Sequence, residues 1–398
     1  MQRALSACFG ADASRRMIHA GRRLLFRFRY PADYALSKQK YDVLFGCGTV
    51  RWQNIKLVVE ELRRSRPDLR LGLAFPGSRE ELRSLLTPPG VTTIAHATVY
   101  TLRLFDTRIL YVATPDLPPS SRPPGALVVH SLMSMASLDG IYSDHHFDGF
   151  DYILCGGPHH VDSFRSLAAR RPALSGTWLL PAGYPKLDLM LGAKPAAQRS
   201  RESPVKPTIV YAPTHVDQAT ESLASLRRHG EAIVDALLAG GYRVIFRPHP
   251  WSFADQDRAL IDRICELHAG NPGFSLDRSK DYTESYSSAD LMVTDISGTG
   301  FTFSLTFGRP CIFFAPSAEA ELGLTGIQFD SRHRIGAPVR SIDEMIEKSS
   351  QLCQSDRAED IRRFRDEFLF NVGGSAAYIA AGLEDVLSGR ERPEWIRL

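Results

Sequence analysis

The stretch Tyr242-Arg-Val-Ile-Phe-Arg-Pro-His-Pro250 joins a short apolar run to a cation, Arg247, and an imidazole, His249. Further along, the apolar run Leu291-Met-Val293 leads into Thr294-Asp-Ile-Ser-Gly-Thr-Gly300 and then into a helix-like segment. Ligands of open α/β sheets bind outside the carboxyl ends of the strands, and backbone N–H groups at a helix start suit an anion. The two stretches therefore predict a parallel sheet whose edge forms a cleft for a nucleotide diphosphate.

Strand-like and helix-like runs alternate along most of the chain, which favours parallel sheets with crossover helices. A polar stretch between Gly192 and Pro207 interrupts the alternation and is typical of an interdomain linker. At 398 residues the chain is also longer than the length that a single hydrophobic core usually stabilises. We expect an α/β protein of two doubly wound, Rossmann-like domains facing each other across a cleft, which resembles the plan of the GT-B transferases.

The same patterns give the expected domain boundaries. The order is a basic amphipathic segment (1–30), an acceptor-side Rossmann-like domain (31–192), a linker (193–207), a nucleotide-binding Rossmann-like domain (208–370) and a C-terminal helix (371–398).

The positive charge of the chain is concentrated at its start. The net charge is +3, yet residues 1–30 hold seven arginines against a single acid, Asp12, so the remainder is net negative. The charge distribution thus excludes a basic domain that would bind nucleic acid. At helical spacing one face of this segment is apolar and the other is rich in arginine, with Phe26 breaking the pattern. The apolar positions are Met17, Gly21, Leu24, Leu25 and Phe28.

Such a helix is typical of a segment that lies in the interface of an anionic membrane, and the alternative is a solvated arm. No apolar run reaches membrane-spanning length, and a signal-peptide pattern is missing at the N-terminus. We therefore expect a cytoplasmic protein, peripheral at the inner face of the cell membrane if the helix binds lipid.

A series of motifs in the second half of the chain resembles those of a known family. In order and spacing, they are similar to the YAPT, RPHP, TDYSS, FDF and RPVIFY series of the CDP-glycerol glycerophosphotransferases, which build teichoic-acid and related capsule backbones. An upstream element resembles the family's GYPRxD, and His130 occupies the place of the histidine in its HGTPLK. The matching stretches are Gly183-Tyr-Pro-Lys-Leu-Asp188, Tyr211-Ala-Pro-Thr214, Arg247-Pro-His-Pro250, Thr294-Asp-Ile-Ser-Gly298, Phe301-Thr-Phe303 and Arg309-Pro-Cys-Ile-Phe-Phe314.

The resemblance implies a GT-B transferase that moves a polyol phosphate, such as glycerol phosphate, from a CDP-activated donor to a hydroxyl of a growing cell-surface polymer, releasing CMP. Its partners would be a CDP-polyol donor and a polymer or lipid-linked acceptor. No cofactor is certain. A requirement for a divalent metal is left open, because the sequence shows no well-defined pair of carboxylates that would bind one.

The site residues follow from the resemblance and from the chemistry of phosphoryl transfer, which depends on positioning and fixed charge. His130 would be the base for the acceptor hydroxyl, and His249 a second catalytic residue that binds phosphate or acts as acid. Arg247 suits a bidentate phosphate contact. The other nucleotide-binding candidates are Thr214, His215, Asp295, Ser297, Gly298, Thr299 and Gly300.

Several positions depart from the family pattern. HGTPLK is replaced by His130-Ser-Leu-Met-Ser-Met135, and Thr302 stands where FDF has its aspartate. The turn Ile296-Ser-Gly298 is closer to the SGG turn of nucleotide-sugar enzymes. Two alternatives are therefore kept: a nucleotide-sugar-dependent GT-B glycosyltransferase of capsule or surface polysaccharide synthesis, and a non-catalytic GT-B scaffold.

Overall fold

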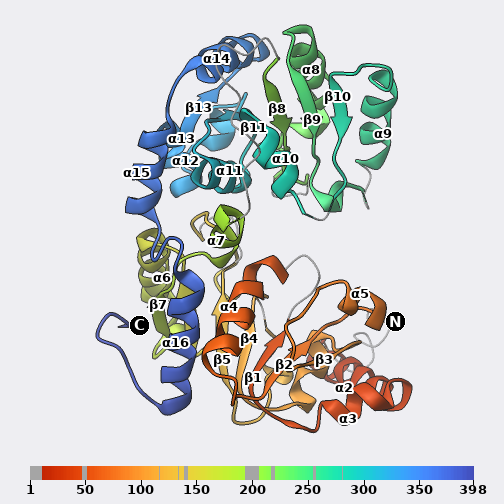
Figure 1. Cartoon of the computed structure of the whole chain (residues 1–398), viewed down its shortest axis with the longest axis vertical. Coiled ribbons are helices and arrows are strands. Elements are labelled where there is room, and N and C mark those ends of the chain that lie inside the picture. Colours follow the sequence, from red (N-terminus) through yellow and green to blue (C-terminus); the bar gives the residue numbers. More distant parts are fainter. Residues whose placement is uncertain are drawn as a thin grey trace. The chain divides into compact units, whose positions relative to one another are not determined.

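The computed structural model of the chain consists of two compact units, each built on its own sheet (Figure 1). The first contains the described residues of Met1–Met133, Tyr142–Asp188 and Phe370–Leu398, and the second those of Ser134–Ile141 and Leu189–Leu369. The structure describes residues 11–46, 52–115, 117–132, 134–138, 142–192, 206–216, 220–253, 257–279 and 281–398.

The first unit holds a sheet in the order β14-β7-β6-β5-β4-β1-β2-β3, parallel except for the β14–β7 pair. The strand order reverses at β1, which lies between β4 and β2. The strands are β1 (Lys40–Gly46), β2 (Leu71–Ala74), β3 (Val91–Ile94), β4 (Asp106–Val112), β5 (Leu127–Ser131), β6 (Tyr152–Cys155), β7 (Trp178–Pro181) and β14 (Ile396–Arg397).

Amphipathic helices cover this sheet. Val43 and Phe45 of β1 are fully buried and belong to one core cluster with Val58 of α4 and Leu383 of α16. The helices of the unit are α2 (Ala11–Arg29), α3 (Pro31–Leu36), α4 (Trp52–Ser65), α5 (Arg79–Arg83), η2 (Val99–Leu104), η3 (Pro119–Ser121), α6 (Pro158–Arg170), η4 (Pro172–Leu174) and α16 (Ser375–Ser388). The helix α7 (Pro185–Gly192) begins in the first unit and ends in the second.

The second unit holds a fully parallel sheet in the order β10-β9-β8-β11-β12-β13, which reverses at β8. Its strands are β8 (Thr208–Tyr211), β9 (Arg243–Phe246), β10 (Phe274–Leu276), β11 (Leu291–Thr294), β12 (Cys311–Phe314) and β13 (Gly336–Val339). Its helices are α8 (Leu226–Ala239), η5 (Pro250–Phe253), α9 (Arg258–Leu267), α10 (Thr283–Ser288), α11 (Thr299–Phe307), η6 (Glu319–Glu321), α12 (Ile327–Asp330), α13 (Arg332–Ile335), α14 (Ile342–Gln354) and α15 (Ala358–Phe368).

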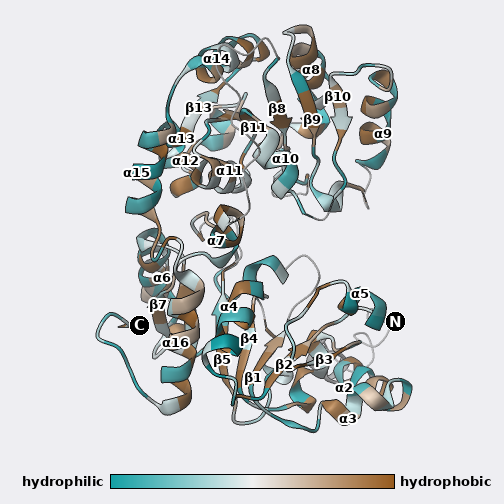
Figure 2. Ribbon diagram, viewed as in Figure 1, coloured by the Kyte–Doolittle hydropathy of each residue, from teal (hydrophilic) through white to brown (hydrophobic). Residues whose placement is uncertain are grey.

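The expected fold class, two Rossmann-like α/β units, is confirmed. Hydrophobic residues run along the strands of both sheets, while the helices carry mixed faces, as expected for strands covered on both sides (Figure 2).

The GYPRxD-like element holds the C-terminal helix on the first unit. The Asp188 carboxylate accepts hydrogen bonds from the backbone N–H groups of Gly373 and Ser375, at 2.7 and 2.8 Å, at the start of α16. Gly183 has a φ of +90°, and a Cβ there would lie 2.4 Å from the Phe370 carbonyl oxygen. This element therefore has a structural role, which explains why glycine and aspartate stand at these two positions.

Candidate functional site

Three neighbouring strands of the second unit end at one edge of its sheet. β9 pairs with β8, and β8 pairs with β11, all in parallel. The segments that follow these strands therefore emerge side by side at the carboxyl edge, where ligands of such sheets bind. They are 212–215, 247–250 and 295–300, and they contain every predicted site residue except His130.

A buried carboxylate connects these segments. Asp295 is fully buried, and its Oδ1 accepts a hydrogen bond from the Thr214 N–H at 3.1 Å and another from the Thr214 hydroxyl. Its Oδ2 accepts from the Ser225 N–H at 2.8 Å and the Ser225 hydroxyl at 2.9 Å, just before α8. Asp295 thus joins the end of β11 to the loop after β8 and to the start of α8, and protein donors use both of its oxygens.

Arg247 is nearly buried and is oriented by the segment that follows β10. Its backbone N–H donates to the Tyr211 carbonyl at 2.8 Å. Its guanidinium donates to the Asp277 carboxylate, to the Ser279 hydroxyl at 3.2 Å and to the Ser279 carbonyl at 2.8 Å. The guanidinium carbon also lies 5.5 Å from the centre of the Tyr282 ring. The positive charge is therefore fixed in place and partly compensated.

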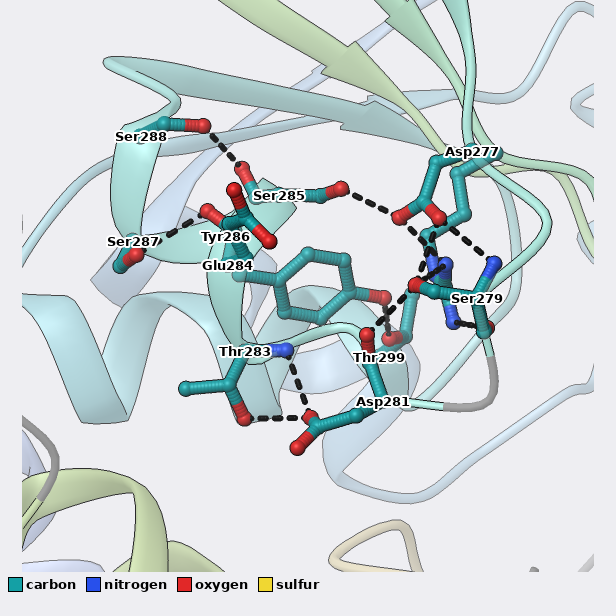
Figure 3. Close-up of polar contacts among 11 residues, drawn as sticks. Asp277, Ser279, Asp281, Thr283, Glu284, Ser285, Tyr286, Ser287, Ser288 and Thr299 are labelled. Atoms are coloured by element: carbon teal, nitrogen blue, oxygen red, sulfur yellow. Dashed lines mark hydrogen bonds and ion pairs between the residues drawn. The ribbon is translucent and has the colours of Figure 1, made fainter.

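The charge of Asp277 is stabilised by several donors (Figure 3). Burial alone would raise the pKa of this carboxyl, but hydrogen bonds from Ser279 and Ser285 together with the Arg247 charge outweigh it, so its pKa is lowered. Oδ1 accepts from the Ser279 N–H at 2.7 Å and the Ser279 hydroxyl at 2.6 Å. Asp277 is therefore an ionised partner of Arg247.

The same segment contacts the start of α11. The Tyr286 hydroxyl shares a hydrogen bond with the Thr299 hydroxyl, and the two point toward each other in Figure 3. The rings of Tyr282 and Tyr286 lie 4.5 Å apart, centre to centre. Two tyrosines from the segment after β10 thus stand beside Arg247 and Thr299.

The turn before α11 is closely packed on its surroundings. The Ser297 hydroxyl accepts a hydrogen bond from the Thr299 N–H at 3.2 Å. A Cβ at Gly298 would lie 3.0 Å from the Ser134 hydroxyl oxygen, and a Cβ at Gly300 would lie 2.9 Å from the Cys311 sulfur. Glycine at these two positions lets the backbone approach segment 134–138 and β12, whatever ligand the turn holds.

An aromatic cluster surrounds His249 where β8 and β9 end. Its ring centre lies 5.9 Å from that of His215 and 5.6 Å from that of Trp251, a side chain that is 68% exposed. Desolvation by burial is the main cause that lowers the pKa of His249 to about 4, and the charges of His215 and Arg247 lower it further. The imidazole is therefore neutral near pH 7, although part of the residue remains exposed.

His130 lies in the first unit, within β5 and one residue before its end. The residue is 1% exposed, and its ring centre lies 5.5 Å from that of Phe147 and 4.7 Å from that of Phe150. Its neighbours in register are Val112 of β4 and Ile153 of β6. The structure thus places His130 among the buried side chains of its unit, and its role as base stays a prediction.

The site contains residues that the sequence reasoning did not single out. Asp277 and Tyr282 contact Arg247, Ser225 completes the Asp295 hydrogen bonds, and Trp251 packs on both histidines. Asp277 directly follows the short strand β10, and the position of an acid at a strand end was the available signal. Within the described ranges, no group of three His, Cys, Asp or Glu side chains is arranged to hold a metal ion.

Comparison with known proteins identifies a related family. The family model described as CDP-glycerol:poly(glycerophosphate) glycerophosphotransferase matches residues 148–381. No curated protein matches the chain at a significant level.

Solved structures share the fold. The wall teichoic acid polymerase TagF is 16% identical with a TM-score of 0.64, and the match covers 96% of this chain and 99% of TagF. A putative UDP-N-acetylglucosamine 2-epimerase from Listeria monocytogenes is 14% identical with a TM-score of 0.59, covering 90% and 100%. The UDP-GlcNAc 2-epimerase of Methanocaldococcus jannaschii is 12% identical with a TM-score of 0.57, covering 86% and 99%.

The Asp295 contacts lead to a stability prediction. Asp295→Ala leaves the buried donors of Thr214 and Ser225 without their acceptor, which should lower the free energy of unfolding of the second unit by about 3 kcal/mol. Urea unfolding monitored by circular dichroism measures the change. Asp360→Ala, at an exposed position of α15, is the matched control. An equal effect of the two substitutions would show that Asp295 does not hold this edge together.

Proposed function

The chain belongs to the CDP-glycerol:poly(glycerophosphate) glycerophosphotransferase family, and we propose that it transfers glycerol phosphate, or a similar polyol phosphate, from a CDP-activated donor to a hydroxyl of a growing surface polymer. The observation that carries the proposal is the carboxyl edge of the second sheet. The matched region includes all three segments that meet there, and they bring a cation, two imidazoles and a helix start together.

The donor diphosphate is proposed to bind at this edge, against the start of α11, Thr214 and the His215–His249 pair. Arg247 supplies positive charge from a fixed position, because Asp277 and Ser279 orient its guanidinium. Asp295 has a positioning role in this proposal, since its oxygens accept hydrogen bonds from Thr214 and Ser225.

In the proposed reaction the acceptor oxygen attacks the β-phosphorus of the donor. A new P–O bond forms, the bond from the β-phosphorus to the bridging oxygen breaks, and CMP leaves with that oxygen. His130 is the proposed base that takes the acceptor proton, because histidine is the side chain that most often serves as a general base. Fixed charge and oriented donors supply the rest of the catalysis.

The purified chain should release CMP from CDP-glycerol when a glycerol-phosphate acceptor is present, and His130→Gln should reduce kcat about 100-fold. The KM for CDP-glycerol should change little, because a base acts in the chemical step. Chromatography of released CMP measures both quantities, and a thermal melt of the variant checks that it folds. Turnover of a UDP-sugar in place of CDP-glycerol would instead support a nucleotide-sugar glycosyltransferase.

The low pKa of His249 gives a pH prediction for donor binding. If the imidazole contacts the diphosphate, binding raises its pKa from about 4 toward neutrality, so the protein takes up a proton. Affinity for CDP-glycerol should therefore increase as the pH falls from 7.5 to 5.5, and His249→Gln should flatten this dependence. Titration calorimetry at several pH values measures it. The same slope in wild type and variant would remove His249 from the diphosphate site.

We further propose that helix α2 binds an anionic membrane surface at the cytoplasmic face of the cell membrane. Its apolar face is open to solvent: Met17 is 50% exposed, Leu24 and Leu25 are both 55% exposed and Phe28 is 74% exposed. Arginines flank this face along the helix. No helix within the described ranges has an apolar stretch of bilayer-spanning length.

The opposite side of α2 fixes the helix to the first unit. Phe26, which breaks the amphipathic pattern, is 2% exposed and packs near Tyr30 and Tyr34. The His19 ring accepts or donates a hydrogen bond at 2.7 Å with the Ser120 hydroxyl, and the Arg22 guanidinium lies 4.3 Å from the Tyr100 ring centre. The helix is thus held with its apolar face outward, which suits shallow insertion into lipid.

The double substitution Leu24→Ser and Phe28→Ser should weaken binding to vesicles that contain phosphatidylglycerol at least about tenfold, because it removes exposed apolar area. Co-sedimentation measures binding, and added salt should weaken it further through the arginines. Leu322→Ser, at a position that is 85% exposed in the second unit, is the matched control. Unchanged sedimentation of the double variant would contradict the proposal.

A further inference from the structure

One large aromatic side chain at the carboxyl edge of the second sheet is open to solvent. Trp251 directly follows the stretch Arg247-Pro-His-Pro250 and lies in the short helix η5, and 68% of the residue is exposed. Trp52 and Trp395, by contrast, are 6% and 5% exposed and belong to the core of the first unit. An indole ring offers a large apolar area for burial, so a ligand that covers Trp251 would gain affinity from the contact.

The backbone around Trp251 is fixed, which gives the exposed ring a defined place. The Ser252 N–H donates a hydrogen bond to the His249 carbonyl at 2.9 Å, and the Trp251 N–H donates to His249 Nδ1 at 3.3 Å. Ser252 is fully buried, and Phe253 packs against the core cluster of the second unit. Trp251 is thus the outward-facing residue of a turn whose neighbouring residues are anchored.

The ring lies next to the two imidazoles that are proposed to contact the donor diphosphate. Its centre lies 5.8 Å from that of His215 and 5.6 Å from that of His249, with interplanar angles of 90° and 81°. These edge-to-face contacts leave most of the indole surface open. In a nucleoside diphosphate only the ribose separates the base from the phosphates. A donor whose diphosphate contacts either imidazole can therefore place its base on Trp251.

The chemistry of the indole surface favours the base over the other parts of the donor. A nucleobase has a flat π face, and stacking on an aromatic side chain strengthens binding by roughly tenfold or more. The polyol end of the donor carries hydroxyl groups, which would lose water against an apolar ring without gaining hydrogen bonds. The phosphates require charge and donors, which the ring does not offer.

We propose that Trp251 is the surface on which the nucleobase of the donor stacks, with the diphosphate on the side of His215 and His249. The proposal rests on the proposed transferase function and adds to it the residue that holds the base. Stacking uses the π face of the base and not its hydrogen-bonding edge. Trp251 would therefore strengthen binding of cytosine and uracil nucleotides alike, and other groups would distinguish the two bases.

Titration calorimetry with CDP and with inorganic pyrophosphate tests this contact, because CDP carries a base and pyrophosphate does not. Trp251→Ala should weaken CDP binding at least about tenfold and leave pyrophosphate binding unchanged. Trp251→Phe keeps an aromatic face and should retain most of the affinity for CDP. Leu267→Ala, at a position of α9 that is 56% exposed, is the matched control and should bind both ligands like wild type. A thermal melt of each variant checks that it folds.

Tryptophan fluorescence gives a second readout, which a purely structural role of Trp251 would not change. The chain has four tryptophans, and Trp251 is the most exposed of them. CDP should therefore quench the emission of wild type. It should not quench Trp251→Phe, even at CDP concentrations that saturate this variant in calorimetry.

Two outcomes would overturn the proposal. One is an equal loss of CDP and pyrophosphate affinity in Trp251→Ala, which would assign the residue to the diphosphate or to the folding of the edge. The other is unchanged CDP affinity in Trp251→Ala, with quenching by CDP kept in Trp251→Phe. Turnover of CDP-glycerol is measured separately. Absent turnover together with Trp251-dependent CDP binding would contradict the transferase function and leave the stacking contact standing.

Discussion

The carboxyl edge of the second sheet depends on one buried carboxylate, that of Asp295. Its hydrogen bonds to Thr214 and Ser225 hold the segment after β8 and the start of α8 against the end of β11. A charged group without such donors would be costly in this position. The same contacts position Thr214 and the turn before α11, so the carboxylate determines the shape of this edge. Both of its oxygens are already used by hydrogen bonds from protein groups.

The charge at this edge is more balanced than the sequence suggested. Arg247 is paired with Asp277, which offsets part of its positive charge. In the proposed diphosphate site, oriented N–H and hydroxyl groups would then supply much of the attraction, because the low pKa of His249, about 4, leaves its imidazole neutral near pH 7. A buried ion pair of this kind fixes geometry more than it adds stability, which suits a guanidinium that has to keep one orientation.

The alternation of strands and helices predicted the two sheets, and the motifs at strand ends predicted which segments would emerge at one edge of the second sheet. The contact of Asp277 and Tyr282 with Arg247 could not be predicted, because it requires β10 to pair with β9, and strand order is not written in local sequence. The two-residue strand β14 is too short to give a periodic signal. His130 was expected at a strand end that faces the cleft, but its packing on Phe147 and Phe150 depends on how the connection between β5 and β6 folds.

The N-terminal helix shows why a departure from a pattern can be informative. On the side of α2 that faces the first unit, His19 bonds to Ser120 and the Arg22 guanidinium lies over the Tyr100 ring, but a regular amphipathic pattern would place no apolar residue there. Phe26 breaks the pattern and supplies a buried contact on this side, near Tyr30 and Tyr34. The helix is then fixed with its apolar face outward, where Leu24 and Phe28 are exposed.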